Sequence, residues 1–154
     1  MAFIRHKGKT KLMYFEGDTA REVRDGGLVT FTDSGTVVPV RNDSTDRPIG
    51  FARRNDTTTD SALVPVEVPV EDYVEWTFDV DSDGSLTDCT VGKYIAIDTT
   101  GGASVLAGDS AGMRVDVSDT AVRTILVTGF ISATRGIGIL ARRCSNIIPD
   151  TGTV

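Results

Sequence analysis

One serine of this chain stands in the sequence pattern of a catalytic nucleophile. Gly108, Ser110 and Gly112 make a Gly-x-Ser-x-Gly motif, which in hydrolases forms a sharp turn between a strand and a helix. The motif also needs a later histidine, but the only histidine, His6, precedes it. The residues after Gly112 are typical of a strand. We therefore interpret the motif as a glycine-rich turn and predict no catalytic residue, while a serine hydrolase using Ser110 stays an alternative function.

Three alternate aspartates form a second pattern with chemical meaning. Asp79, Asp81 and Asp83 precede Gly84, as in the first half of a calcium-binding loop, where alternate carboxylates converge on the ion. The twelfth position of such a loop needs a bidentate glutamate, and Thr90 occupies it here. We interpret the segment as a turn between strands and predict no metal site and no cofactor. A calcium- or glycan-binding β module of a fibre or adhesin stays a further alternative.

The N-terminal segment differs from the rest of the chain in charge. Residues 1–15 carry four basic side chains and no acidic one, whereas residues 16–154 carry 12 basic and 22 acidic groups, a formal charge of −10. Such asymmetry is typical of a segment that contacts a partner, and four charges on an acidic protein are too few to favour nucleic acid. We predict that residues 1–24 form an arm, either an ordered arm or an extra strand, and we predict no nucleic-acid partner. The arm residues expected to contact a partner are Phe3, Ile4, Arg5, Lys7, Lys9, Lys11, Leu12, Tyr14 and Phe15.

The composition predicts an all-β body over residues 25–154. Val, Ile and Thr together make up 48 of the 154 residues, against seven Leu, and Asp outnumbers Glu by 17 to five. Side chains branched at Cβ pack well on a pleated sheet, while Asp and the 16 Gly favour tight turns. We predict a small β-barrel, β-tulip or sandwich. The one short helix expected is residues 18–24, with Asp18 as its N-cap.

Residues 63–70 form the most regular predicted strand, because apolar and other residues alternate there. Pro65 and Pro69 occupy alternate positions between the valines and cannot donate a ladder hydrogen bond, which favours an edge strand or a strand with one free side. Val64, Val66, Val68 and Val70 are therefore predicted to contact a partner at this edge. Further strands are predicted at residues 28–31, 36–40, 48–52, 73–80, 91–98, 104–106, 114–117, 123–127 and 129–133, with a hairpin turn at 33–35 and a loop over 53–61.

No segment of the sequence resembles a membrane span or a signal peptide. No window reaches the roughly 18 apolar residues that a span needs, and no apolar stretch follows the basic N-terminus. We expect a soluble protein made inside a cell, with no membrane partner. Cys89 and Cys144 are interpreted as two free thiols, although a bridge between them stays open.

The order of several β segments resembles that of the head decoration, or capsid cement, proteins of tailed bacteriophages. The resemblance covers roughly residues 25–135. Its segments are Gly26-Gly27-Leu28-Val29, Thr36-Val37-Val38-Pro39-Val40, Pro48-Ile49-Gly50-Phe51-Ala52, Leu63-Val64-Pro65-Val66-Glu67-Val68, Val91-Gly92-Lys93-Tyr94-Ile95-Ala96-Ile97-Asp98 and Thr128-Gly129-Phe130-Ile131.

The resemblance implies a structural virion protein rather than an enzyme. Its location would be the outer surface of an icosahedral capsid, its partner the major capsid protein, and its oligomeric state a homotrimer. An arm could staple capsid subunits by adding a strand to a neighbouring sheet. Deletion of residues 2–15 is then expected to leave a folded protein that no longer binds capsids.

Overall fold

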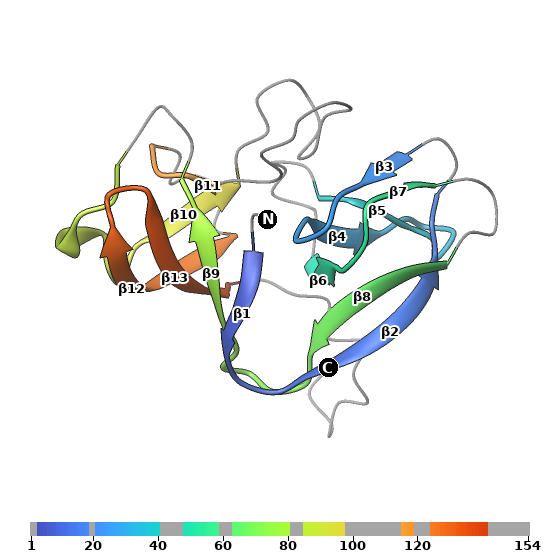
Figure 1. The fold of residues 1–154 in the computed structure, drawn as a ribbon, viewed down its shortest axis with the longest axis horizontal. Coiled ribbons are helices and arrows are strands. Elements are labelled where there is room, and N and C mark those ends of the chain that lie inside the picture. Colours follow the sequence, from blue (N-terminus) through green and yellow to red (C-terminus); the bar gives the residue numbers. More distant parts are fainter. Residues whose placement is uncertain are drawn as a thin grey trace.

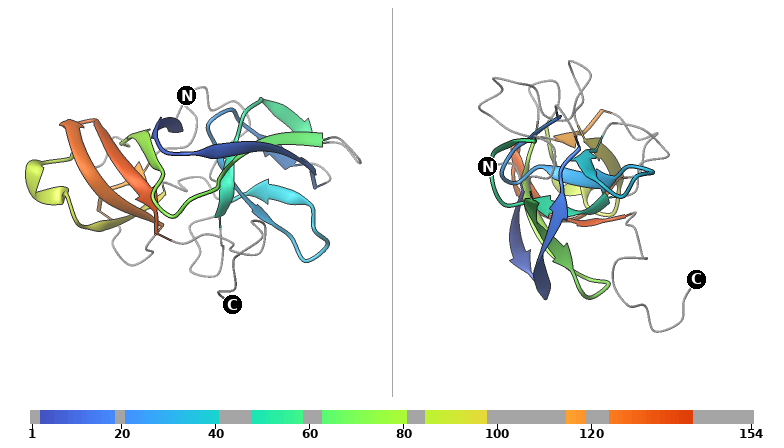
Figure 2. Two further views of the ribbon diagram at one scale, coloured as in Figure 1. Left: turned by 90° about the horizontal axis from the view of Figure 1, so that it is seen from below. Right: turned by 90° about the vertical axis from the view of Figure 1, so that its right-hand side faces the viewer.

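The computed structural model describes residues 3–18, 21–40, 48–58, 63–80, 85–97, 115–118 and 124–141. In these ranges the chain forms thirteen β-strands and one 3-10 turn, η1 (Asp88–Thr90). The all-β prediction is therefore confirmed. Two curved sheets lie side by side along the long axis of the molecule, as Figures 1 and 2 show.

The first sheet has six strands in the order β1-β9-β13-β12-β10-β11, all paired antiparallel. A parallel bridge between Val80 and Val115 brings the end of β9 to β11, so the sheet curls toward closure. The strand bounds are β1 (Phe3–Lys7), β9 (Glu75–Asp79), β13 (Arg135–Leu140), β12 (Ile125–Ser132), β10 (Tyr94–Ile97) and β11 (Val115–Asp116).

The second sheet has five antiparallel strands in the order β2-β8-β6-β4-β5. Gly17, just after β2, bridges Val37 of β5, and the Asp18 N–H donates to the Val37 carbonyl at 3.0 Å, so this sheet also curls. A small separate sheet pairs β3 with β7. The bounds are β2 (Thr10–Glu16), β8 (Leu63–Pro69), β6 (Pro48–Ala52), β4 (Leu28–Phe31), β5 (Val37–Pro39), β3 (Arg21–Val23) and β7 (Asp56–Thr58).

The alternating valines of β8 face the inside of the curled five-stranded sheet. Val64, Val66 and Val68 are at most 1% exposed, which follows from the two-residue period of a strand. They share an apolar core with residues from four further strands. That core consists of Val23, Val29, Val37, Ile49, Ala52, Val64, Val66 and Val68, with Met13, Phe15 and Phe31 packed against it.

The prediction that residues 63–70 form an edge strand is wrong, because β8 pairs with β2 on one side and β6 on the other. The Arg53 N–H donates to the Pro65 carbonyl at 2.9 Å, so the backbone of Pro65 faces β6. Pro69, four residues on, faces the same side. Pairing with β6 covers only two residues of β8, and both prolines lie outside it. An interior strand can therefore contain these two prolines, because no hydrogen bond to β6 requires the backbone N–H that each of them lacks.

A second core fills the space between the two large sheets. The ring of Phe3 stacks on Phe51 with centroids 4.7 Å apart, and the Phe51 and Trp76 centroids are 4.2 Å apart. Phe3 comes from β1, Phe51 from β6 and Trp76 from β9, so this aromatic contact joins both sheets. Its members are Phe3, Leu28, Val40, Phe51, Val74, Trp76, Phe78, Val80, Leu86, Ile95, Ile97, Val115, Ile125 and Val127.

Two connections cross between the sheets next to each other, from β1 to β2 and from β8 to β9 (Figure 1). The Lys9 N–H donates to Oε1 of Glu71 at 2.7 Å, and the Val70 N–H donates to the Lys9 carbonyl at 3.1 Å. Gly8 has a φ of 106°, and a Cβ there would lie 2.9 Å from the Tyr73 carbonyl oxygen. Glycine thus permits both the turn and the close approach.

The separation of the chain into an arm (1–24) and a body (25–154) does not describe this fold. Residues 3–16 form one strand in each large sheet, and Phe3 is fully buried between the sheets. The apolar residues interleaved with the basic ones are the signal for these two strands. The first strands of the chain are thus integral to both sheets.

Two smaller expectations are also corrected, and one is confirmed. The helix predicted at residues 18–24 is wrong, because Arg21–Val23 is strand β3. The loop predicted at 53–61 contains β7, which pairs with β3. The predicted hairpin turn lies between β4 and β5, where Gly35 has a φ of 83° and its N–H donates to the Thr32 carbonyl at 3.0 Å. The predicted strand at 104–106 lies outside the described residues.

Candidate functional site

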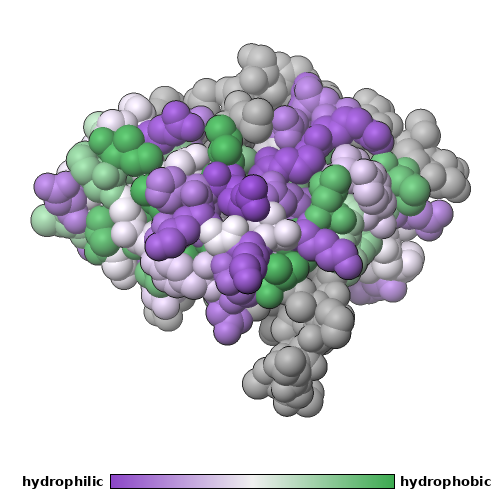
Figure 3. Space-filling view, turned by 60° about the horizontal axis from the view of Figure 1, so that its bottom comes forward, coloured by the Kyte–Doolittle hydropathy of each residue, from purple (hydrophilic) through white to green (hydrophobic). Residues whose placement is uncertain are grey.

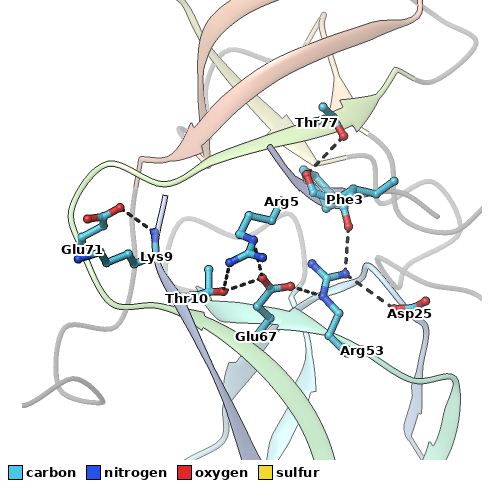
Figure 4. Close-up of polar contacts among 10 residues, drawn as sticks. Phe3, Arg5, Lys9, Thr10, Asp25, Arg53, Glu67, Glu71 and Thr77 are labelled. Atoms are coloured by element: carbon cyan, nitrogen blue, oxygen red, sulfur yellow. Dashed lines mark hydrogen bonds and ion pairs between the residues drawn. The ribbon is translucent and has the colours of Figure 1, made fainter. Parts of the chain in front are cut away.

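Charged side chains from both sheets meet along their shared boundary, as Figure 4 shows. Glu67 of β8 lies at the centre and is 16% exposed. Arg5 of β1 places Nε 3.5 Å from Oε1 of Glu67, while Arg53, after β6, donates its Nε–H to Oε2. Thr10 donates its hydroxyl to Oε1 of Glu67 at 2.7 Å and accepts from Nη1 of Arg5 at 3.1 Å. We call these four residues the seam cluster.

Arg53 connects the seam cluster to the aromatic core. Its Nη1 donates to the Phe3 carbonyl at 3.1 Å and lies 3.7 Å from Oδ1 of Asp25. The guanidinium carbon lies 5.9 Å from the ring centroid of Phe51 and 5.6 Å from that of Trp76, within the range of a cation–π contact. Arg53 therefore binds β1, β8 and the core at once.

The seam cluster has a structural role. Both carboxylate oxygens of Glu67 already have partners, and charge-assisted hydrogen bonds of this kind are strong when partly buried. The sequence analysis did not single out Glu67. The signal available for it is a lone charge in a strand of valines and prolines, next to an arginine pair at Arg53 and Arg54.

The outer face of the β2–β8 pair is buried where the two large sheets meet, and it is exposed to solvent further from that boundary. Leu12 is paired with Glu67, and Glu67 with Phe51, so the three side chains share a face. Phe51 is buried, whereas Leu12 is 49% exposed. Tyr14 and Leu63 lie on the same face by register and are 58% and 52% exposed. We call Leu12, Tyr14 and Leu63 the β2–β8 face.

Figure 3 shows the molecule with its bottom turned forward. Hydrophilic residues occupy the middle of this view, and hydrophobic residues gather in separate patches on either side. The surface therefore offers apolar contact areas bordered by polar and charged groups, the composition of many protein interfaces.

The predicted arm residues divide into exposed and buried ones. Phe3 is fully buried, and Phe15 is half-buried with its ring 5.1 Å from that of Phe31. The prediction that these two contact a partner is wrong for this fold, because both pack in the cores. Arg5 contacts Glu67. The arm residues that remain exposed are Ile4, Arg5, Lys7, Lys9, Lys11, Leu12 and Tyr14.

The four valines predicted to contact a partner also divide. Val64, Val66 and Val68 are core residues, so the prediction is wrong for them. An alternating apolar pattern is as typical of a strand face buried in the core as of one that contacts a partner. Val70 follows β8 and is 38% exposed. It stays available for a surface contact.

A polar group lies on the outer side of β9, where Glu75 is 16% exposed. His6 places Nε2 4.0 Å from Oε2 of Glu75, and the Thr128 hydroxyl donates to Oε1 at 3.5 Å. The hydrogen bond from Tyr73 to Glu75 is the main cause that raises the pKa of Tyr73 above 10.0, with burial and the negative charge of Glu75 adding to it. The pair keeps the Tyr73 hydroxyl neutral to higher pH.

The residues of the calcium and hydrolase alternatives lie mainly outside the described ranges. Asp79 is described, and its Oδ1 lies 3.9 Å from Nε of Arg135. Ser110, Asp81 and Asp83 lie outside the described residues, as does Cys144. Cys89 is a free, exposed thiol.

No group of three or more His, Cys, Asp or Glu side chains is arranged to hold a metal ion within the described ranges. Likewise, no helix in the described part of the chain has the length and hydropathy needed to cross a membrane.

No family model, no curated protein and no solved structure matches this chain.

Proposed function

We propose that this chain is a structural virion protein that binds the outer surface of an icosahedral phage capsid and stabilises it. The observation that carries the proposal is the exposed β2–β8 face, whose strands pack on the apolar core of the five-stranded sheet. The order of β segments in the sequence supports the same class of protein. The partner in this proposal is the major capsid protein, and the chain performs no catalysis.

The β2–β8 face has the composition of a contact surface. Leu12, Tyr14 and Leu63 are each about half exposed, and tyrosine is enriched where proteins bind one another because it offers a large rigid surface with one polar end. The exposed Lys7, Lys9 and Lys11 belong to the same β1–β2 segment. They would favour an acidic patch on the partner and speed the encounter.

A rigid scaffold suits such a role. The seam cluster and the aromatic core hold β1 and β2 at fixed positions in the two sheets, so little conformational entropy is lost when the face binds. A standard interface of about 800 Å² per partner would suffice for each copy. Many copies on one shell would then reinforce the shell jointly.

The test is co-sedimentation of the purified chain with undecorated capsids of the phage that encodes it. A double variant, Leu12→Asp with Tyr14→Asp, places two charges on the β2–β8 face, and we expect at least tenfold weaker binding. Ile131→Asp is the matched control, because Ile131 is 48% exposed on β12 of the other sheet. Failure of the wild-type chain to bind capsids, or equal loss in the control, would contradict the proposal.

A further inference from the structure

Two hydrogen-bond donors in the core between the large sheets have no acceptor. The indole N–H of Trp76 and Nη2 of Arg53 are both buried, and neither donates to a protein atom within the ranges that the structure describes. A buried donor without a partner is costly, so most buried polar groups are bonded either to the protein or to an ordered water. The two donors therefore call for an acceptor that the surrounding side chains and backbone do not supply.

Both donors border the same part of the core. The guanidinium carbon of Arg53 lies 5.6 Å from the ring centroid of Trp76, and Nη2 is attached to that carbon. The other two nitrogens of the guanidinium already donate, Nε to Glu67 and Nη1 to the Phe3 carbonyl. One oxygen can accept from two donors that are up to about 6 Å apart, twice the length of a single hydrogen bond. A single small group can thus satisfy Trp76 and Arg53 together.

The aromatic faces in this core do not replace such an acceptor. The rings of Phe51 and Trp76 have centroids 4.2 Å apart and are tilted by 51°, and the Arg53 guanidinium lies within cation–π range of both. Those contacts attract the charge of the guanidinium, but a hydrogen bond to an aromatic face is weak compared with one to oxygen. An oxygen acceptor is still the favoured partner of the two N–H groups.

The missing acceptor has to be small and neutral. Trp76 is 1% exposed, and both donor atoms are buried, so the acceptor must be small enough to be enclosed. The charges around Arg53 already balance, since Arg5 and Arg53 face the carboxylates of Glu67 and Asp25. A buried anion would add an unpaired charge at a high desolvation cost. Water meets both conditions.

The same region also offers an acceptor for the hydrogens of a water molecule. The Phe3 carbonyl accepts from Nη1 of Arg53 at 3.1 Å and keeps a second lone pair. A buried water typically makes about three hydrogen bonds. Trp76, Arg53 and Phe3 supply that number.

We propose that a buried water molecule accepts hydrogen bonds from Nε1 of Trp76 and Nη2 of Arg53. Arg53 follows β6 of the five-stranded sheet, and Trp76 lies on β9 of the six-stranded sheet. The water therefore joins the two sheets inside the core, next to the direct bonds of the seam cluster. A bridging water of this kind is nearly as favourable as a direct hydrogen bond. This inference does not depend on capsid binding.

NMR of the wild-type chain tests for the water directly. Trp76 is the only tryptophan, so its indole N–H gives one signal. We expect cross-peaks between this proton and water that have opposite signs in NOE and ROE spectra, as a bound water produces. Exchange of the proton with bulk solvent gives equal signs instead. A crystal structure should show a density peak about 2.7–3.2 Å from both nitrogens.

A pair of adjacent arginines tests whether Arg53 shares the water. Arg53→Lys removes Nη2 and keeps the positive charge, and we expect at least a twofold weaker cross-peak between the indole proton and water. Arg54→Lys is the matched control, because Arg54 is the next residue and is exposed. Its cross-peak should equal that of the wild type. An unchanged cross-peak in Arg53→Lys would overturn the shared position of the water.

Removal of the indole donor gives a test that depends on the sign of the result. Incorporation of 3-benzothienylalanine at position 76 replaces the N–H by sulfur with little change in shape. If a water accepts from this N–H, the replacement loses a bond and should lower Tm by about 2–4 °C. If the N–H has no acceptor, the replacement removes an unpaired buried donor and raises Tm. A raised Tm, equal signs in the two NMR spectra, or no density at this position would overturn the inference.

Discussion

Arg53 donates its Nε–H to Oε2 of Glu67, and the same guanidinium donates to the backbone of Phe3. This one side chain thereby joins the five-stranded sheet to the first strand of the six-stranded sheet. Both members of the ion pair are largely buried, with side chains 18% and 16% exposed. The β1–β2 segment is thus fixed by polar bonds as well as by the burial of Phe3.

Replacement of Glu67 by glutamine should destabilise the protein by about 1–3 kcal/mol, because two arginines lose a charged partner while the shape is kept. Urea unfolding followed by circular dichroism measures the change. Glu16→Gln, at an exposed position of β2, is the control and should change the free energy of unfolding by no more than about 0.5 kcal/mol. Equal effects of both variants would show that the seam cluster does not hold the sheets together.

Phe3→Ala should cost about 3–5 kcal/mol, since the ring is fully buried against Phe51 and Phe78 and its removal leaves a cavity. The neighbouring Ile4→Ala is the control, because Ile4 is 40% exposed. Thermal unfolding of the two variants side by side makes the comparison. A Phe3→Ala protein as stable as Ile4→Ala would contradict the integral position of β1.

The integral positions of β1 and β2 in the two large sheets change the expectation for the truncated chain. Deletion of residues 2–15 removes β1 and nearly all of β2, one strand from each large sheet. We now expect a protein without a cooperative unfolding transition, rather than a folded body lacking an arm. A cooperative transition in the truncated chain would restore the picture of a separable arm.

The raised pKa of Tyr73 gives a prediction at alkaline pH. In the folded protein the pKa lies above 10.0, so the unfolded chain releases this proton first as the pH rises. The contribution of Tyr73 to stability is therefore complete below pH 10 and is lost as the pH rises above it. Titration by tyrosinate absorbance should show a lower pKa for Tyr73 in Glu75→Gln, with Tyr73→Phe identifying the signal. An unchanged titration in Glu75→Gln would contradict the assigned cause.

The serine hydrolase alternative has a direct chemical test. A fluorophosphonate probe labels activated serines, and we expect no labelling at Ser110. Ser110→Ala provides the background level for the measurement. Labelling of the wild-type chain above that background would replace the structural function with an enzymatic one.

The sequence predicts the strands of this protein better than their places in the sheets. Residues 48–52 and 28–31 are predicted with their observed bounds, because each is a short, mainly apolar run between polar or turn-forming segments. The small β7 strand is not predicted, since its Thr-rich sequence also suits a loop and only pairing with β3 makes it a strand.

Position within a sheet depends on partners distant in sequence. Pro65 and Pro69 correctly predict that one side of β8 lacks a complete ladder of hydrogen bonds. The pairing with β6 on that side covers only two residues, so β8 is an interior strand despite the two prolines. The basic charge of the first residues likewise gives no sign that Phe3 is buried. Contacts such as Arg53 with Glu67 depend on the mutual placement of strands, which no local pattern specifies.

The central claim is that this chain lies on the outside of a phage capsid, and labelling of intact virions tests it most directly. Purified particles are treated with an amine-reactive biotin reagent that does not cross the shell, and the labelled polypeptides are identified by mass spectrometry. The proposal predicts that this chain is abundant and labelled at exposed lysines such as Lys7 and Lys9 while the particles stay intact. Its absence from the particles, or labelling only after they are disrupted, would contradict the proposal.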